Sequence, residues 1–557
     1  MRRHRKYIFV VGGVMSGVGK GIASSSIGKI LQAKSFRVTA LKIDPYINVD
    51  AGTMSPTEHG EVFVLDDGDE TDQDMGNYER FLGISLSRIN YMTTGRVYQA
   101  VIEKERNLEY RGKNVEVVPD IPLEVIRRIE RAADTAKADV TVVEIGGTVG
   151  EYQNIIFVEA ARMMKLKHSK DVAFVMVSYL PIPTKIGEMK TKPTQYAARA
   201  LNSVGVQADI IVARSEKPLD EKRKEKIAIF CNIPAEHVIS APDVESVYDV
   251  PLNFEKDRLS EKLLKILDLP SRRKADMHEW ASFVRKSKDG KKTVNIAVVG
   301  KYFDSGSFIL SDVYISVLEA IKFSAYQLGL KPHLTYINSK DFSAKGGSAS
   351  GEGKLKLSTL AKFDGVIVPG GFGEKGVEGV ISAIKYVRQH KIPFLGLCYG
   401  MQLAVVEFAR NVCRWRDAHT TEVAPRTGHP VIDIMPEQRE HLAQNRFGAT
   451  MRLGACPAIL CKGSLAHRAY GAGKISERHR HRYEVHPEFI EDIEHHGLIF
   501  SGKSPDGRLC EIAELPEKIH PFFLGTQFHP EFKARPLSPH PLFTAFLAAA
   551  ARKRTKR

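Results

Sequence analysis

Short apolar runs alternate with longer amphipathic stretches along most of the chain, and this alternation limits the possible folds more than any other feature. In the first half the runs are YIFVVGG, VTALKI, VTVVEI, VAFVMVSY and ADIIVAR. Such continuous apolar runs are typical of strands buried on both faces, so they predict a parallel sheet covered by helices. A second series runs from TVNIAVVG through DGVIVPGG and IPFLGLCYG to an apolar helix at residues 542–550. The sequence therefore predicts an α/β protein with two domains.

A charged stretch without apolar periodicity separates the two series. We interpret residues 271–292 as a linker between a first domain at residues 1–270 and a second at residues 293–550, followed by a basic tail at residues 551–557. A chain of 557 residues is long enough for two or three domains. Residues 343–358 are rich in Gly, Ser and Lys and are interpreted as a surface loop.

Composition and charge exclude several classes of protein. The hydrophobic share of 43% is that of a globular protein, and no apolar stretch approaches the roughly 18 residues of a membrane span. No secretion signal follows the basic first residues, so we expect a cytoplasmic protein whose six cysteines are reduced. Nine positive charges at residues 2–6 and 552–557 account for most of the net charge of +15. No nucleic-acid motif accompanies them, so nucleotides are better candidate partners than nucleic acid.

A glycine-rich turn, GGVMSGVGKG at residues 12–21, joins the first predicted strand to a helical pattern. Backbone N–H groups and the positive helix end would face an anion there, and Lys20 adds charge, so the turn predicts a polyphosphate site. Gly21 replaces the hydroxyl residue that usually holds Mg²⁺. Asp74 and Glu144 are the candidate ligands instead. The alternatives are a purely structural turn and a solvated acidic loop.

Three further polar stretches follow predicted strands of the first domain. Lys42 begins KIDPYINVDAGTMSP and is expected at the carboxyl edge of the sheet, where ligands bind in such folds. Three glycines in EIGGTVGEYQ, residues 144–153, would let backbone approach a ligand. MKTKPTQ, residues 189–195, places two lysines before a helical pattern and predicts a second phosphate site, unless these lysines are ordinary surface charges.

A cysteine in the second domain lies between an apolar strand and an amphipathic helix. Cys398 is flanked by Gly396 and Gly400, which gives the G-x-C-x-G pattern of a nucleophile elbow. FHPEF, residues 528–532, is interpreted as a strand that places a candidate base, His529, and Glu531 on one face. Gly371 and its neighbour in VPGGFGEKG offer N–H donors for an oxyanion. The alternative is a buried structural cysteine.

From about Tyr7 to Phe546 the chain resembles the CTP synthase family, in which a P-loop amidoligase synthetase domain is joined to a class I glutamine amidotransferase domain. The motifs that carry the resemblance are YIFVVGGVMSGVGKG, LKIDPYINVDAGTMSP, HGEVFVLDDGDETDQDMGNYERF, KTKPTQ, PGGFG, LGLCYGMQ, RHRHRYEV and QFHPEF, in this order. The resemblance implies that ATP phosphorylates O4 of UTP, and that ammonia released from glutamine displaces the phosphate to give CTP.

The resemblance also implies roles for the residues that match these motifs. The residues implied for ATP are Gly17, Val18, Gly19, Lys20, Gly21, Ile22, Lys42, Asp74 and Asp243, with Mg²⁺ on Asp74 and Glu144. Those implied for UTP, or for CTP as feedback inhibitor, are Ser16, Glu151, Tyr152, Gln153, Lys190, Thr191, Lys192, Pro193, Thr194, Gln195 and Lys226. Those implied for glutamine are Gly371, Tyr399, Gly400, Met401, Gln402, Glu422 and Arg482. Cys398 would attack glutamine, His529 would transfer the proton and Glu531 would orient the imidazole.

The family further implies a homotetramer with GTP as allosteric activator. Two stretches depart from its pattern: GTVGEYQ replaces the usual GTVGDIE, and Lys375 replaces an arginine after PGGFG. These departures concern CTP inhibition and coupling between the sites. The competing interpretations are another P-loop amidoligase that amidates carboxylates of a large cofactor precursor, and a P-loop switch protein with a decayed amidotransferase. The latter would be expected to lack Cys398 or His529, and both are present.

Overall fold

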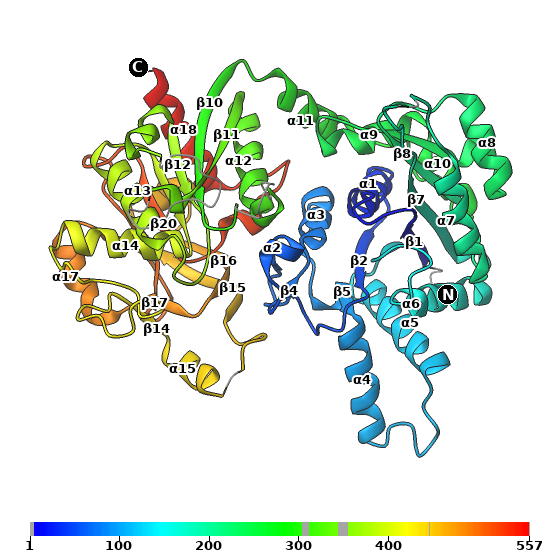
Figure 1. Ribbon diagram of the computed structural model, residues 1–557, viewed down its shortest axis with the longest axis horizontal. Helices are drawn as coiled ribbons and strands as arrows, with labels where there is room; N and C mark the ends of the chain where they lie inside the picture. Colours follow the sequence, from blue (N-terminus) through cyan, green and yellow to red (C-terminus); the bar gives the residue numbers. More distant parts are fainter. Residues whose placement is uncertain (1–4, 186, 304–310, 343–354, 445, 556–557) are drawn as a thin grey trace. The chain divides into compact units, whose positions relative to one another are not determined.

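The computed structural model describes residues 5–185, 187–303, 311–342, 355–444 and 446–555. Contacts between residues divide the chain into two compact units. Unit 1 comprises Met1–Asp50 and Asp74–Val284, and unit 2 comprises Ala51–Gln73 and Arg285–Arg557. Both units are built around a sheet flanked by helices (Figure 1).

Unit 1 contains a seven-stranded sheet in the order β5-β2-β6-β1-β7-β8-β9. Every neighbouring pair in it is parallel. Its strands are β1 (Lys6–Gly12), β2 (Val38–Asp44), β5 (Tyr91–Thr93), β6 (Val140–Ile145), β7 (Val172–Tyr179), β8 (Ile210–Ser215) and β9 (Val238–Pro242). Each of the five apolar runs of the first half forms one of these strands, so the predicted parallel sheet is confirmed.

Helices cover both faces of this sheet because its strands are apolar at successive positions. Phe9 and Val11 pack into a core with residues of α4 to α8, whereas Ile8 and Val10 pack into a second core with α1, α9 and α10. The helices are α1 (Lys20–Ala33), α3 (Gln73–Leu82), α4 (Thr94–Arg106), α5 (Val117–Thr135), α6 (Ile155–Lys167), α7 (Lys192–Ser203), α8 (Glu221–Cys231), α9 (Val250–Lys256), α10 (Leu259–Ile266) and α11 (His278–Asp289). The far end of α4 and the chain leading into α5 extend away from the sheet (Figure 1).

Unit 2 contains a nine-stranded sheet in the order β11-β10-β12-β13-β20-β19-β18-β15-β16. Pairing is parallel from β11 to β20 and antiparallel from β20 to β16. The strands are β10 (Lys292–Gly300), β11 (Leu330–Asn338), β12 (Gly365–Val368), β13 (Phe394–Leu397), β15 (Arg452–Leu460), β16 (Lys474–His481), β18 (Ile499–Lys503), β19 (Cys510–Glu514) and β20 (Phe523–Thr526). Two short antiparallel sheets pair β3 (Phe63–Val64) with β4 (Glu70–Thr71), and β14 (Ile432–Ile434) with β17 (Tyr483–Val485).

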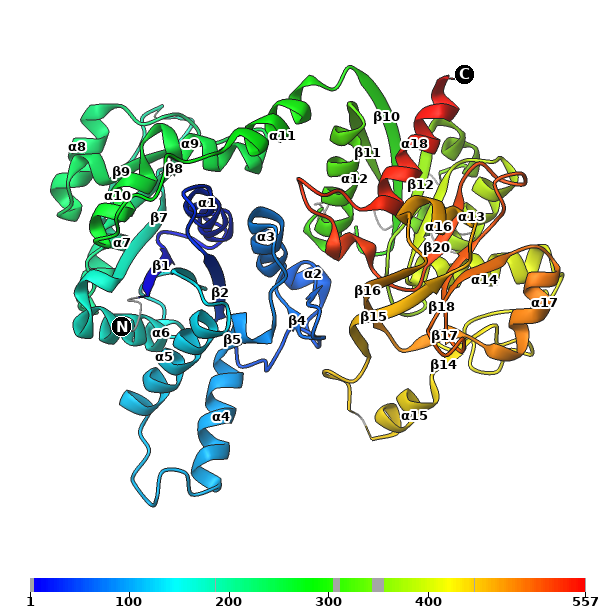
Figure 2. The same cartoon turned by 180° about the vertical axis from the view of Figure 1, so that it is seen from behind.

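The helices of unit 2 pack around this sheet, as seen from behind in Figure 2. Apolar residues of α13 and α14 form one core with residues of β10, β12 and β13. The helices are α2 (Pro56–His59), α12 (Ile315–Gln327), α13 (Val377–Gln389), α14 (Tyr399–Asn411), α15 (Pro436–Ala443), α16 (Leu465–Tyr470), α17 (Ile490–His495) and α18 (Pro541–Thr555). The predicted terminal helix is thus present, and it continues through residues 551–555 of the predicted basic tail.

Residues 51–73, called here the strap, belong to unit 2 although the chain around them belongs to unit 1. Two ion pairs attach the strap to β16: Arg478 Nε lies 2.6 Å from Asp66 Oδ1, and Arg480 Nε lies 2.8 Å from Glu70 Oε1. The rings of Phe63 and Phe532 also meet edge to face at 5.1 Å. The sequence-based prediction places residues 1–270 in one domain and does not separate residues 51–73 from it.

The predicted linker at residues 271–292 contains a helix. Trp280 of α11 is buried, and its indole N–H donates to the carbonyl oxygen of Tyr248 at 2.9 Å. Packing of α11 against unit 1 explains why the contacts divide the chain at residues 284 and 285. Most of the predicted surface loop, residues 343–354, lies outside the described residues. Among the described helices, none has the length and apolar character required to cross a bilayer.

Candidate active sites

The glycine-rich turn of unit 1 connects β1 to α1, as the sequence predicts. Gly17 and Gly19 have φ of 68° and 90°, conformations that favour glycine. The Lys20 ammonium donates to the carbonyl oxygen of Gly147 at 2.9 Å. A Cβ on Gly12 would lie 2.8 Å from Lys20 Nζ, so glycine is needed there for the lysine to fold back over the turn.

A buried lysine and three carboxylates lie at the ends of β2, β6 and α3. Lys42 and Glu144 are register partners on adjacent strands, and Lys42 Nζ lies 2.9 Å from Glu144 Oε1 and 3.6 Å from Asp44 Oδ1. It also pairs with Asp74, in the first turn of α3. Burial lowers the pKa of Lys42, but the carboxylates, Asp74 first, outweigh burial and hold it well above its usual value.

The carboxylates share the Lys42 ammonium unequally. Burial raises the pKa of Asp74, but its pairing with Lys42 leaves the pKa below its usual value. Burial dominates at Glu144 and raises its pKa. The Tyr78 hydroxyl donates to Glu144 as well. Among the described residues, no group of three or more His, Cys, Asp or Glu side chains is arranged to hold a metal ion, so the two predicted metal ligands are held together by a lysine here.

Arg214 connects two segments that the sequence assigns to ATP. It donates to the carbonyl oxygen of Val18 at 3.3 Å and to Asp243 Oδ1 at 2.9 Å. Sequence reasoning missed Arg214, although it ends the apolar run ADIIVAR at the carboxyl edge of the sheet. Ser16 and Gly17 lie in the turn, and Gly21 and Ile22 lie in the first turn of α1.

The residues predicted for UTP and CTP lie on four segments of unit 1: the glycine-rich turn with Ser16, residues 190–195, the loop after β6, and α8 with Lys226. At the start of α7, Thr194 accepts from the Ser178 hydroxyl at 2.8 Å, and Gln195 donates to Thr191 at 3.1 Å. Lys192 and Pro193 form the first turn of the same helix. Lys190 and Lys226 both act on Glu188, because a hydrogen bond from Lys190 and then the charge of Lys226 lower its pKa.

The third of these segments is the loop after β6. Gln153 donates to Glu151 Oε2 at 2.7 Å. Tyr152, between them, is 98% exposed. The three residues implied for CTP are therefore at the surface of unit 1, in a loop that Lys20 contacts through Gly147.

Cys398 lies at a tight turn between β13 and α14, as predicted. Its φ of 49° and ψ of −99° are unusual for a residue with a side chain. The flanking glycines are required by packing: a Cβ on Gly396 would lie 2.7 Å from the backbone of Gly400, and one on Gly400 would lie 2.3 Å from the carbonyl oxygen of Val368. The strained elbow thus depends on both glycines of the G-x-C-x-G pattern.

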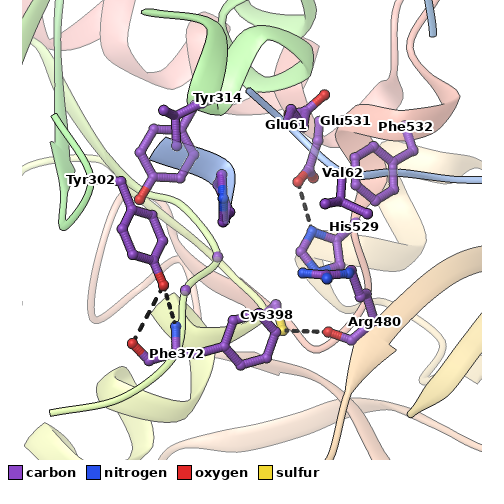
Figure 3. A pocket seen from close by; sticks show the side chains of 14 residues that line it. Glu61, Val62, Tyr302, Tyr314, Phe372, Cys398, Arg480, His529, Glu531 and Phe532 are labelled. Atoms are coloured by element: carbon purple, nitrogen blue, oxygen red, sulfur yellow. Dashed lines mark hydrogen bonds and ion pairs between the residues drawn. The ribbon is translucent and has the colours of Figure 1, made fainter. Parts of the chain in front are cut away.

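His529 and Glu531 lie beside this cysteine (Figure 3). His529 Nδ1 lies 2.8 Å from Glu531 Oε1. Burial lowers the pKa of His529, but Glu531 and Cys398 outweigh burial and raise it to about 10. The thiol of Cys398 points to the carbonyl oxygen of Arg480 at 3.8 Å and accepts from Gln527 at 3.6 Å. The cysteine, imidazole and carboxylate therefore have the arrangement expected of a nucleophile, a proton carrier and the residue that orients the proton carrier.

The predicted strand at residues 528–532 is wrong. β20 ends at Thr526, and Pro530–Lys533 forms a 3₁₀ turn. Pro530 cannot donate to a ladder, which favours the end of the strand before it. The side chains of His529 and Glu531 are brought together by this tight turn and not by the alternation of side chains along a strand.

A cavity of about 60 Å³ opens at the Cys398 thiol. Its walls come from both parts of unit 2 and include Pro56, Glu61 and Val62 of the strap. Figure 3 shows Glu61 and Val62 on one side and Tyr302 and Tyr314 on another. The carboxylate of Glu61 accepts from the Ser316 N–H at 3.2 Å, which fixes this part of the strap beside α12.

The oxyanion turn is held by side chains that sequence reasoning missed. The Phe372 N–H donates to the Tyr302 hydroxyl at 3.0 Å, and the Gly373 N–H donates to Glu422 Oε1 at 2.7 Å. Lys301 donates to the carbonyl oxygen of Phe372 at 2.7 Å and also to that of Gly373. Burial lowers the pKa of Lys301 to about 8, against the charge of Glu422. The signal for Lys301 was its place directly after the strand TVNIAVVG.

The residues predicted for glutamine lie on several segments of unit 2. Gly371 lines the cavity. Tyr399 donates to the carbonyl oxygen of Gly373 at 2.9 Å, and Gln402 donates to that of Tyr483 at 2.9 Å. Gly400 and Met401 are buried in the first turn of α14. Glu422 lies beside Tyr399, and its charge is one of the causes that raise the Tyr399 pKa.

Arg482 has other partners in this structure. Its guanidinium donates to Gln438 Oε1 at 2.6 Å, to Thr450 Oγ1 at 2.9 Å and to the carbonyl oxygen of Phe447 at 2.6 Å. It would have to exchange some of these for a substrate carboxylate, so its predicted role stays a prediction. Arg480, which sequence reasoning missed, lines the cavity instead.

Comparisons with known proteins match both halves of the chain. The family model described as CTP synthase N-terminus matches residues 6–269, and that of glutamine amidotransferase class-I matches residues 309–549. The CTP synthase of Thermococcus gammatolerans is 51% identical over 547 residues, which are 98% of each chain. That of Methanocaldococcus jannaschii is 47% identical over 555 residues, 99% of each chain. A solved glutaminase domain of Trypanosoma brucei CTPS with bound acivicin is 36% identical, with a TM-score of 0.41, over 46% of this chain and 94% of that one.

Proposed function

The chain belongs to the CTP synthase family, and from this premise we propose how its residues share the reaction. The enzyme aminates UTP to CTP with glutamine as nitrogen donor. We assign glutamine hydrolysis to unit 2 and the nucleotide chemistry to unit 1. The observation that carries this assignment is the assembly of Cys398, His529 and Glu531 at a cavity, because glutamine hydrolysis needs a nucleophile, a proton carrier and room for a carboxamide.

In unit 2, Cys398 gives its thiol proton to His529, its sulfur attacks the carboxamide carbon of glutamine and the carbonyl π pair moves to oxygen. The N–H of Gly371 is the proposed donor to that oxygen, since Phe372 and Gly373 donate theirs elsewhere. When the C–N bond breaks, His529 gives its proton to the leaving nitrogen and ammonia is released. Water then attacks the thioester, which frees glutamate and the thiol. Glu531 keeps the imidazole oriented and stabilises its charged form whenever the imidazole holds the extra proton.

The other proposed glutamine contacts hold the amino acid end of the substrate. Glu422 is the candidate partner of the α-ammonium group, and Arg482 is the candidate partner of the α-carboxylate. Glu422 bonds the Gly373 N–H in this structure, and Arg482 bonds the segment around Phe447. Tyr399, Gly400, Met401 and Gln402 begin α14 directly after Cys398 and are the remaining proposed glutamine contacts.

In unit 1, the turn at residues 16–22 binds the triphosphates of ATP and UTP. Lys20 and Lys42 stabilise the phosphoryl group that passes from ATP to O4 of UTP. Phosphorylation makes that oxygen a good leaving group, and ammonia then displaces it at C4 as phosphate. Ammonia is sequestered from bulk water on the way, because there it would be protonated and lost as a nucleophile. Asp243 lies by the adenine, tied to the turn through Arg214.

Magnesium fits the donor set of unit 1. Asp74 and Glu144 supply carboxylate oxygens, the ligands that Mg²⁺ prefers. Both converge on the Lys42 ammonium, and the three carboxylates around that ammonium have enough negative charge to accommodate a second cation. Bound there with nucleotide, the ion would neutralise phosphate charge. Lys42 keeps the carboxylates together and favours the ionised form of Asp74.

The proposed UTP site is formed by residues 190–195 and Lys226, with Ser16 from the turn. Thr191, Thr194 and Gln195 are already fixed by hydrogen bonds at the start of α7, and a helix start favours phosphate. Glu151, Tyr152 and Gln153 are proposed to bind CTP as feedback inhibitor. GTP is proposed as activator of glutamine hydrolysis, by family resemblance.

A homotetramer in the cytoplasm is proposed as the working form of the enzyme. Exposed apolar residues of unit 1 support self-association: Ile102, Leu108, Val117, Val118, Leu123, Tyr152, Ile155 and Leu166 are each at least 47% exposed. Exposed apolar side chains mark an interface when they form a contiguous patch. Light scattering of the purified protein tests this, and a monomer with and without nucleotide would contradict it.

The reaction itself is tested by incubating the protein with ATP, Mg²⁺, UTP and glutamine, and following the ultraviolet absorbance change from uracil to cytosine. CTP and glutamate should form in equal amounts. Omission of UTP, ATP or Mg²⁺ should each prevent the absorbance change. If no change occurs with glutamine or with ammonia, the proposed assignment of chemistry to these residues fails.

A further inference from the structure

Strands β15, β16 and β19 of unit 2 carry a second cluster of ionisable side chains, distinct from the residues that line the Cys398 cavity. Cys456 lies on β15 and is partly exposed. In the antiparallel register it faces Glu477, and Gly454 faces His479. Register partners and residues two apart on one strand point to the same face. Cys456 and His479 therefore share a face of the sheet, and the glycine leaves space between them.

The surroundings of His479 require its imidazole to be a cation. The ring is fully buried. Nδ1 lies 3.0 Å from the carbonyl oxygen of Glu477, and Nε2 lies 2.7 Å from Glu511 Oε2. Both neighbours only accept hydrogen bonds, whereas a neutral imidazole has a single N–H. Burial lowers the pKa of His479, but the neighbouring Cys456 and Glu511 outweigh burial and raise it to about 9.

The other charged groups of the cluster are paired with one another. Arg452 lies 2.6 Å from Glu511 Oε1 and 3.0 Å from Glu484 Oε1. Burial and then the charge of Glu511 raise the pKa of Glu484 to about 8. The carboxylate of Glu477 bonds the Tyr470 hydroxyl at 2.9 Å and lies 3.0 Å from His540 Nε2. His481 stays neutral because burial holds its pKa well below the usual value.

These charges favour the thiolate of Cys456. Burial raises its pKa, but the neighbouring His479 imidazolium, with the charge of Arg452, outweighs burial and the opposing charge of Glu511, so that the pKa is lowered. A thiolate beside a cation and open to solvent is the setting of a reactive cysteine. No step of CTP formation proposed above uses it.

We propose that Cys456 is a second nucleophilic thiol of this enzyme and a modification site for small uncharged electrophiles. In the reaction with iodoacetamide, the Cys456 sulfur attacks the methylene carbon, an S–C bond forms, and iodide leaves with the electrons of the C–I bond. His479 keeps its proton. Partial burial admits a small neutral reagent and disfavours bulky or charged ones.

The chain contains a matched reference thiol, Cys461, which is exposed. Cleavage after Arg452 and Lys462 releases both cysteines in one peptide, LGACPAILCK. Fragment ions of the singly labelled peptide therefore compare the two thiols in the same molecule. The experiment uses the full-length protein and brief, substoichiometric labelling with iodoacetamide at pH 6.0 to 9.0.

An ordinary thiol is about 1% ionised at pH 6.5, and its labelling rises about tenfold per pH unit below its pKa. We expect Cys456 to be labelled faster than Cys461 at pH 6.5, and its labelling to rise less steeply with pH than that of Cys461. Equal slopes for the two thiols, or slower labelling of Cys456 at pH 6.5, would overturn the proposal.

His479→Gln removes the cation and should give Cys456 the steep pH dependence of Cys461. Retention of fast labelling at pH 6.5 in a folded His479→Gln protein would show that the imidazolium is not the cause, and would overturn the proposal. If this variant does not fold, the wild-type comparison of the two thiols still decides.

Discussion

Gly21 gives the Asp74 carboxylate room to reach the phosphate turn: a Cβ at position 21 would lie 2.1 Å from Asp74 Oδ1 and 2.8 Å from its Cγ. The residue that replaces the usual hydroxyl ligand of Mg²⁺ is thus in direct contact with the carboxylate proposed as the ligand in its place. The loss of the hydroxyl and the position of Asp74 are two parts of one arrangement.

Gly21→Ala should therefore displace Asp74 and lower CTP synthesis at least about 100-fold with glutamine and with ammonia alike, since both routes need phosphoryl transfer. Steady-state absorbance assays with each nitrogen source measure this. Basal glutamine hydrolysis, which depends on unit 2, is the internal control and should change less than about twofold. Normal synthesis by a folded Gly21→Ala protein would contradict the proposed metal site.

Cys398→Ala should abolish synthesis with glutamine and preserve synthesis with ammonia, because ammonia bypasses the thiol. We expect a loss of at least about 1000-fold in the first activity and less than about threefold in the second. The matched control is Lys20→Ala, which should abolish both routes. Equal loss of both activities in Cys398→Ala would contradict two separable sites.

Glu531→Gln should lower glutamine hydrolysis about 100-fold and shift its pH profile. In the wild-type protein the pKa of His529 is about 10, because Glu531 and Cys398 outweigh burial. Without the Glu531 charge the pKa falls, so the imidazolium is lost at lower pH and the alkaline limb of kcat/KM moves to lower pH. An unchanged limb would contradict the role of this pair. Glu517→Gln, an exposed site, is the control.

Lys301→Met should remove a pH dependence near pH 8. Burial lowers the pKa of Lys301 to about 8 against the charge of Glu422, so the ammonium that holds the Phe372 and Gly373 carbonyls loses its charge above pH 8. Wild-type kcat/KM for glutamine should therefore decline between pH 7.5 and 9. The variant should be about tenfold less active at pH 7 and lack this decline. The same decline in the variant would assign it to another group.

Arg478→Met should release the strap from β16. Arg478 is fully buried, pairs with Asp66 and donates to the Val64 carbonyl oxygen at 3.1 Å. Loss of these bonds should cost about 2 kcal/mol of unfolding free energy and make residues 51–73 more susceptible to limited proteolysis. Lys533→Met is the control, because Lys533 lies farther from Asp66, at 3.7 Å. Unchanged proteolysis within the strap would contradict its attachment by Arg478.

The sequence was most informative where all the residues that determine a local geometry lie within one motif. The glycine turn at residues 12–21 and the elbow at Cys398 are local, and each glycine that the structure requires there is visible in the sequence. The five apolar runs of the first half predicted strands for the same reason, since burial on both faces leaves a continuous pattern.

Features that depend on distant parts of the chain were missed. The strap has a short buried apolar run at residues 62–65 between polar stretches, and nothing in its sequence reveals that Arg478 and Arg480 would bind it. Lys301 and Gln527 act on the site through contacts that only the folded chain creates. The pairing of His529 with Glu531 was predicted correctly for an incorrect reason, because a turn at Pro530 produces the proximity that strand alternation was expected to give.

The chain passes from one unit to the other at residues 50 and 51, 73 and 74, and 284 and 285. No single cut can therefore separate the two catalytic bodies. A fragment beginning at Arg285 would keep the nucleophile and its imidazole but lose Pro56, Glu61 and Val62, leaving the chamber at the thiol open to bulk solvent. A free-standing version of this glutaminase would need another segment to close that side of the chamber.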